Sequence, residues 1–219
     1  MYLQAPGVTV QEQVFRCLRN WLVAGEVKIA NLPTSPLFAF IIEALASEQL
    51  FDSAVDVICE LIHETQEIDD HMAAIELIVT RLLALKLKPQ LTQQREDSDK
   101  IRGYAGIFSE AGNAYRSLII RHRETFFPIV DVIGECSAYP DLNIVPITFP
   151  FWMRFAQVIG KRSSVSPLFL DAYGALMAVI INHLHFPPNS APLAGQEAAD
   201  FRSFRHIMGD TLKDCCLVS

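Results

Sequence analysis

Glycine is scarce in this sequence, with 10 among 219 residues, and only 20% of the residues are charged. Both features argue against a disordered chain, and a hydrophobic content of 51% is enough to build a sizeable core. Basic charge is also in short supply, since 18 Lys and Arg stand against 25 Asp and Glu. Direct binding to nucleic acid or to an anionic membrane needs basic surface, so both are disfavoured, and a basic protein is the better partner.

Cysteine is sparse as well, and its spacing matches no metal-binding motif. The sequence contains neither a C-x-x-C pair nor a His-flanked zinc pattern. An odd number of cysteines, most of them inside apolar runs, indicates reduced thiols in an intracellular protein. These cysteines are Cys17, Cys59, Cys136, Cys215 and Cys216.

Catalytic motifs are missing too. There is no H-E-x-x-H, no G-x-S-x-G and no P-loop. His183 and His185 are two residues apart, so on a helix they point in different directions, and satisfied or solvated histidines are favoured over metal ligands. Carboxylates at positions 52, 56, 60 and 64 predict a solvated helix stripe before an acid/base pair. We therefore expect no enzyme, no cofactor and no metal site.

No segment has the pattern of a signal peptide or a membrane span. The first 14 residues lack a basic start and a sustained apolar stretch. The most apolar segment, 168–186, is interrupted by Asp171, Asn182 and His183 and closed by two prolines. This segment is predicted to be a helix buried on most sides.

What the sequence has in abundance is apolar residues at helical spacing, punctuated by proline. No run alternates in the way a strand does. We predict helices over 9–27, 37–46, a segment opening near 48, 69–87, a segment opening near 98, 125–138, 149–160, 167–185 and 197 to the end.

The first helices of successive pairs start at regular intervals. Their starts near positions 11, 48, 99, 149 and 197 are separated by 37, 51, 50 and 48 residues. This spacing is close to the roughly 40 to 47 residues of HEAT-type units, whose helix pairs stack to bury a continuous core. The predicted fold is an all-α, HEAT-type helical-repeat solenoid of about four helix pairs plus a final helix. We expect residues 1–219 to form a single segment of this solenoid, cut from a longer chain.

Five large apolar residues are predicted to be buried between these helices: Phe51, Ile58, Phe108, Tyr115 and Trp152. Three glycines in one predicted helix are better explained by close helix–helix approach than by phosphate binding, because no strand precedes them. They are Gly103, Gly106 and Gly112.

The last four residues, Cys216 to Ser219, satisfy the pattern for farnesylation, and Cys215 could be a second lipid site. Only Lys213 supplies positive charge nearby, and 201–215 is predicted to be one continuous amphipathic helix. A chain cut inside a helix is therefore favoured over a lipid anchor, although the sequence leaves both open.

Charge is unevenly distributed along the chain. The stretch 29–80 has ten acidic residues and no Lys or Arg, whereas 81–123 has nine basic residues and four acidic ones. In helix-pair solenoids the second helix of each pair usually lines the concave side, which makes its exposed charges candidates for partner contact. The candidates are Glu43, Glu76, Arg81, Lys86 and Lys88.

Several runs carry a family resemblance: 50–65 (LFDSAVDVICELIHET), 107–112 (IFSEAG), 139–142 (YPDL), 147–152 (ITFPFW) and 201–216 (FRSFRHIMGDTLKDCC). Together they resemble the central HEAT-repeat segment of a transportin-SR or transportin-3-like karyopherin of the importin-beta superfamily. The resembling residues are helix-packing positions, so they indicate the family without indicating which residues bind partners.

The resemblance implies a nuclear import receptor that shuttles between nucleus and cytoplasm. Its expected partners are Ran-GTP, nucleoporin Phe-Gly repeats and cargo such as serine/arginine-rich splicing factors or other RNA-binding proteins. Ran-contact residues of the family have no matching positions here. The alternative is a helical-repeat interaction scaffold unrelated to nuclear transport.

Overall fold

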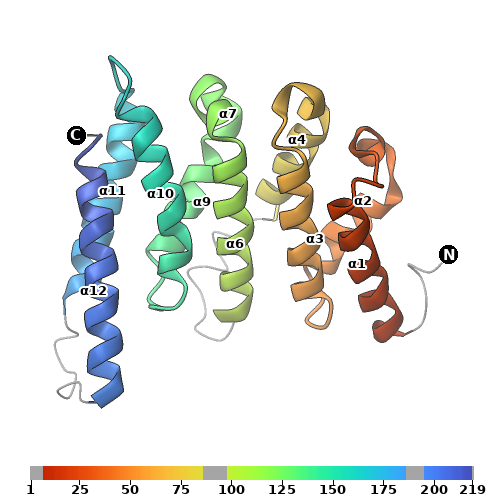
Figure 1. Ribbon diagram of the computed structural model, residues 1–219, viewed down its shortest axis with the longest axis horizontal. Helices are drawn as coiled ribbons and strands as arrows, with labels where there is room; N and C mark the ends of the chain where they lie inside the picture. Colours follow the sequence, from red (N-terminus) through yellow and green to blue (C-terminus); the bar gives the residue numbers. More distant parts are fainter. Residues whose placement is uncertain (1–6, 86–97, 186–194, 219) are drawn as a thin grey trace. The chain divides into compact units, whose positions relative to one another are not determined.

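The computed structural model describes residues 7–85, 98–185 and 195–218 (Figure 1). These residues contain helices and no strand, which confirms the predicted all-α helical-repeat fold. The chain divides into two compact units, Met1–Ile129 and Val130–Ser219. The prediction of one segment over 1–219 remains a prediction.

Unit 1 is built from helix pairs. Its elements are α1 (Val8–Val23), the 3-10 helix η2 (Ile29–Thr34), α2 (Pro36–Ala44), α3 (Phe51–Glu64), α4 (Ile68–Leu83), α6 (Ser98–Ala114), α7 (Arg116–Arg121) and α8 (Arg123–Phe126). Helices α1, α3 and α6 lie side by side, while α2 packs on α3 and η2 packs on α4 (Figure 1).

Unit 2 contains most of α9 (Pro128–Ser137), followed by α10 (Val145–Ile159), α11 (Pro167–Leu184) and α12 (Gly195–Cys215). Helix α12 packs on both α10 and α11. The aromatic side chains of α10 and α11 form its centre. Trp152 lies edge-on to Tyr173 with ring centroids 5.3 Å apart, and the Tyr173 hydroxyl donates to the Trp152 carbonyl at 2.7 Å.

The five residues predicted to be buried are all buried. Phe51 of α3 meets Tyr104 of α6 edge-on, with ring centroids 5.4 Å apart, so apolar stripes from neighbouring pairs form one core in unit 1. Tyr115 lies in the break between α6 and α7.

The glycine prediction is confirmed at Gly103 and wrong at Gly106. A Cβ atom added at Gly103 would lie 2.5 Å from Cε1 of Phe51, so only glycine lets α6 come this close to α3. A Cβ atom at Gly106 meets nothing within 4 Å, because this position faces away from the close contact.

These two glycines form a matched pair for measurement. Gly103→Ala should lower the free energy of unfolding by about 1–3 kcal/mol, since the buried Phe51 ring has to shift in a packed core. Gly106→Ala should raise it by up to about 1 kcal/mol, because alanine favours the helix where space is open. Denaturant unfolding of both variants measures the difference. Equal effects would contradict the close approach.

Helix α1 ends four residues before its predicted end. Gly25 adopts a left-handed backbone conformation with φ of 72°, and its N–H donates to the Leu22 carbonyl at 2.8 Å. This is a glycine-dependent helix stop. Trp21 has the helical spacing of the apolar stripe, but its side chain is 58% exposed, and Phe15, Leu18 and Leu22 face the core instead.

Proline positions account for two further corrections. Helix α10 begins at Val145 and not at 149, because Pro146 fits the first turn, where a missing N–H is tolerated, and Pro150 is accommodated inside the helix. The helix predicted over 125–138 is divided into α8 and α9, since Pro128 opens a new helix after Phe126.

Helix α11 has the predicted bounds to within one residue, but its predicted burial on most sides is wrong. Only 22% of its 18 residues are buried, in the single stripe Phe169, Tyr173, Leu176 and Ile180. Within the described parts of the chain, α11 alone is long and apolar enough to cross a membrane, with mean hydropathy 1.4. That is weak evidence for a span, because helices of soluble proteins can pass the same test.

The continuous helix predicted over 201–215 is confirmed as part of α12. Cys215 is buried and Cys216 is exposed, and the turn after them packs against the end of α10. A Cβ atom at Gly160 would lie 2.5 Å from the Leu217 carbonyl oxygen. Ser219 lies outside the described residues, so the farnesylation pattern stays untested.

Candidate interaction surface

The exposed faces of α2 and α4 carry acidic side chains. On α2, Glu43 is exposed in the same row as Pro36 and Ala39, opposite the buried Phe38 and Ile41. Because the neighbouring side chains in this row are small, the carboxylate is accessible to a partner. Glu43, predicted as a contact residue, therefore lies where a contact is possible.

Helix α4 repeats this arrangement. Its exposed row is Asp69, Ala73, Glu76 and Thr80, on the side opposite the buried Ile75 and Leu82. Asp69 also stabilises the helix, because a carboxylate in the first turn interacts favourably with the helix dipole. We call Glu43, Asp69 and Glu76 the acidic row.

Arg81 is exposed in the last turn of α4, at the end opposite Asp69. Lys86 and Lys88 lie outside the described residues. The structure thus gives Glu43, Glu76 and Arg81 exposed positions on second helices of pairs, while their role in binding remains a prediction. That this side is concave also remains a prediction.

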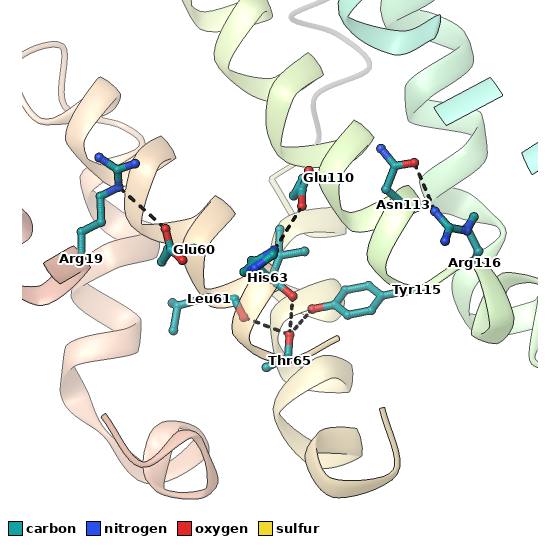
Figure 2. A network of polar contacts seen from close by, with 10 residues as sticks. Arg19, Glu60, Leu61, His63, Thr65, Glu110, Asn113, Tyr115 and Arg116 are labelled. Carbon is teal, nitrogen blue, oxygen red and sulfur yellow. Dashed lines mark hydrogen bonds and ion pairs between the residues drawn. The ribbon is translucent and has the colours of Figure 1, made fainter. Parts of the chain in front are cut away.

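The carboxylate stripe on α3 is only partly solvated. Asp56 is 63% exposed, as predicted, but the side chain of Glu60 is only 16% exposed. The reason is Arg19 of α1, whose Nε lies 3.8 Å from Glu60 Oε2 (Figure 2). Its Nη1 also lies 3.9 Å from Asp56 Oδ2. Because Arg19 lies next to these two carboxylates, fewer carboxylates without a nearby cation remain on α3 than in the acidic row.

A second polar contact links α3 to α6. His63 Nδ1 lies 4.0 Å from Glu110 Oε1, and both side chains are largely accessible to solvent (Figure 2). This contact is an ion pair only when His63 is protonated, and even then an exposed pair contributes at most about 1 kcal/mol. Its Glu110 carboxylate also helps to raise the pKa of nearby Cys59.

A buried hydrogen bond lies beside this contact. The hydroxyls of Thr65 and Tyr115 are 2.6 Å apart, and Thr65 Oγ1 is also 2.9 Å from the carbonyl oxygens of Leu61 and Ile62 (Figure 2). Thr65 caps the end of α3, while Tyr115 lies between α6 and α7. The pair joins two repeats, and nothing in the sequence pattern had indicated it.

Unit 2 has a comparable buried network. Ser137 Oγ accepts from Trp152 Nε1 at 3.0 Å and lies 2.8 Å from Thr148 Oγ1. His183 Nε2 lies 2.9 Å from the Ser137 carbonyl oxygen, so this histidine is satisfied by backbone, as predicted. It fixes α11 to the end of α9.

Within the described residues, no group of three His, Cys, Asp or Glu side chains is placed to hold a metal ion. Burial is the main cause that raises the pKa of both Cys59 and Cys136 to about 12, so these thiols stay protonated and are poor nucleophiles.

Comparison with known proteins gives the family context. The family model for the second TPR domain of transportin-3 and importin-13 matches residues 96–183. Like HEAT units, TPR units are helix pairs, in agreement with the fold. An uncharacterized protein of Schizosaccharomyces pombe is 33% identical over 222 residues, which cover 94% of this chain and 23% of that protein.

Two relatives have informative names. The mRNA transport regulator MTR10 of Saccharomyces cerevisiae is 32% identical over 94% of this chain and 22% of its own length. Transportin MOS14 of Arabidopsis thaliana is 26% identical over 95% of this chain and 24% of its own length. The chain thus spans under a quarter of the length of each of these relatives. Fold and comparisons together confirm the resemblance to a transportin-like karyopherin segment that was drawn from the sequence.

Proposed function

We propose that this chain is a segment of a nuclear transport receptor that shuttles between nucleus and cytoplasm. The observation that carries the proposal is its similarity, over 94% and 95% of its length, to an mRNA transport regulator and a transportin. The receptor imports serine/arginine-rich splicing factors or other RNA-binding proteins, contacts nucleoporin Phe-Gly repeats and releases cargo when Ran-GTP binds. Because Ran and cargo favour different conformations, each weakens binding of the other by the same free energy.

The acidic row supports a basic cargo. Glu43, Asp69 and Glu76 are exposed on α2 and α4, and no ion pair with a described residue neutralises them. Complementary charge raises association rates and excludes partners of the wrong sign. Arginine-rich segments of RNA-binding proteins have the sign and density of charge that this row attracts.

The deciding experiment is a pull-down with GTP-locked Ran, comparing this chain with a longer polypeptide that contains it. We expect the longer polypeptide to bind Ran-GTP and Phe-Gly repeats, and Ran-GTP to displace an arginine-rich cargo from it. Cargo binding without any response to Ran-GTP would contradict the transport proposal and favour the scaffold alternative.

Charge reversal tests the acidic row directly. The double variant Glu43→Lys, Glu76→Lys should slow association of an arginine-rich peptide by about 3- to 10-fold at low salt, because steering charges act mainly on association rate. Stopped-flow association at two salt concentrations measures this. The control Glu48→Lys, Glu124→Lys makes the same change in net charge at exposed positions outside α2 and α4. Equal slowing by both pairs would show a net-charge effect only.

The basic end of α4 gives the opposite prediction. Reversing Arg81 and Lys86 together should slow capture of an acidic or phosphorylated partner at low salt, with a difference that shrinks as salt screens the charges. If these residues only complete the helix dipole, stabilising the fold by about 0.3–1 kcal/mol each, partner kinetics will be unchanged and the melting temperature lower.

A further inference from the structure

The loop between α10 and α11 (Figure 1) contains two basic residues and two serines that are exposed. It reads Lys161, Arg162, Ser163, Ser164, Val165, and the first four of these residues are exposed. Neither Lys161 nor Arg162 forms an ion pair in the part of the chain that the structure describes. The flanking helices α10 and α11 neither pair with these side chains nor cover them.

The backbone of this loop is also available. The Arg162 N–H donates to the Ile159 carbonyl at 3.0 Å, and the next backbone bonds run from Phe169 and Leu170 to the Ser166 carbonyl. Between them, residues 163–165 make no backbone–backbone hydrogen bond to any described residue. A segment with free N–H and C=O groups can lie extended in the cleft of another protein without breaking a helix.

We propose that Ser164 is a phosphorylation site for a serine/threonine kinase that selects basic residues before its acceptor. Arg162 is two residues and Lys161 three residues before the serine, where acidic groups in a kinase cleft would bind them, and apolar Val165 follows directly. Ser163 has the same cations one residue closer, and Ser166 precedes Pro167 at the start of α11, so neither has this combination.

The reaction uses magnesium ATP as the co-substrate. The Ser164 hydroxyl oxygen forms a bond to the γ-phosphorus while the bond from that phosphorus to the β,γ-bridging oxygen breaks. ADP leaves, and the hydroxyl proton passes to a carboxylate base of the kinase. The product adds a charge of about −1.5 to −2 to a loop that carries two cations.

The modified serine would change its surroundings in two ways. Its phosphate could pair with Lys161 or Arg162, which would order the loop and cancel its positive charge. It would also lie just before α11, whose N-terminal dipole favours an anion. The site therefore converts a basic loop into a nearly neutral one without disturbing the buried stripe of α11.

The test is phosphorylation of the folded 219-residue chain by a basophilic serine/threonine kinase with magnesium ATP, with sites mapped by mass spectrometry. We expect up to one phosphate per chain, located on Ser164. Ser164→Ala should abolish this uptake, and Lys161→Ala with Arg162→Ala should slow it by at least about tenfold through loss of the charge contacts. Ser163→Ala should stay within about twofold of the parent, because it leaves both cations in place.

Serines in described helices serve as internal controls. Ser117 of α7 and Ser203 of α12 each follow an arginine directly but lack a basic residue two or three positions earlier. Phosphate on either of them, or on Ser163 in place of Ser164, would overturn the assignment. Uptake only after heat unfolding would overturn it too, since the loop would then not be accessible in the folded chain. Circular dichroism of the variants checks that all remain helical.

Discussion

Replacing Phe108 by alanine is expected to lower the free energy of unfolding by about 3–5 kcal/mol. Phe108 lies on α6 with 1% of its surface exposed, inside the core that α3 and α6 share. The substitution removes a large apolar side chain from contact and leaves a cavity, because close-packed neighbours collapse only partly. The higher helix propensity of alanine offsets less than about 1 kcal/mol of this loss in the free energy of unfolding.

The matched control for this variant is Trp21→Ala. It removes an even larger aromatic side chain, but from an exposed position on α1, so we expect a change of about 0.5 kcal/mol or less. Denaturant unfolding followed by circular dichroism measures both. A near-neutral Phe108 variant, or equal effects of the two variants, would mean that the buried and exposed faces are reversed.

Trp21 and Phe108 also show when apolar spacing in the sequence predicts burial correctly and when it does not. Apolar spacing of 3.6 residues identifies a helix and the direction of its stripe, and for Phe108 this was sufficient because helices adjoin α6 in the repeat. For Trp21 it was not, since spacing alone does not say whether a neighbouring helix covers each side of the stripe. Burial depends on neighbours as well as on periodicity.

The same limit applies to charged and polar positions. Glu60 falls in a regular acidic stripe, and only the position of Arg19 on another helix explains why it is largely covered. Glu43 and Glu76 were predicted correctly as exposed, because exposure on a narrow helix face follows from the local pattern. Proline gave the least reliable boundary signal, since the helix expected from 149 begins at Val145, with Pro146 in its first turn.

The hydrogen bond between Thr65 and Tyr115 should produce the second large effect. Thr65 donates to a backbone carbonyl at the end of α3, which leaves its oxygen to accept from the Tyr115 hydroxyl at 2.6 Å. Both side chains are buried, and burial raises the pKa of Tyr115, so its hydroxyl keeps its proton. No water is needed to satisfy either group.

Removing the two partners should not have equal effects. Thr65→Val leaves the Tyr115 hydroxyl buried without an acceptor, and we expect it to lower the free energy of unfolding by about 1–3 kcal/mol. Tyr115→Phe removes the donor, while Thr65 keeps its bond to the α3 backbone, so a loss of about 0.5–1.5 kcal/mol is expected.

The double variant Thr65→Val, Tyr115→Phe separates this hydrogen bond from ordinary packing. With both hydroxyls gone, no buried polar group lacks a partner, and two apolar groups of nearly the same shape meet instead. Its loss of stability should therefore be smaller than the sum of the single losses by about 0.5 kcal/mol or more. Denaturant unfolding of the parent, the two single variants and the double variant completes the cycle. Strict additivity would show that the two hydroxyls do not interact, so that α3 and the α6–α7 break would be held together by apolar packing alone.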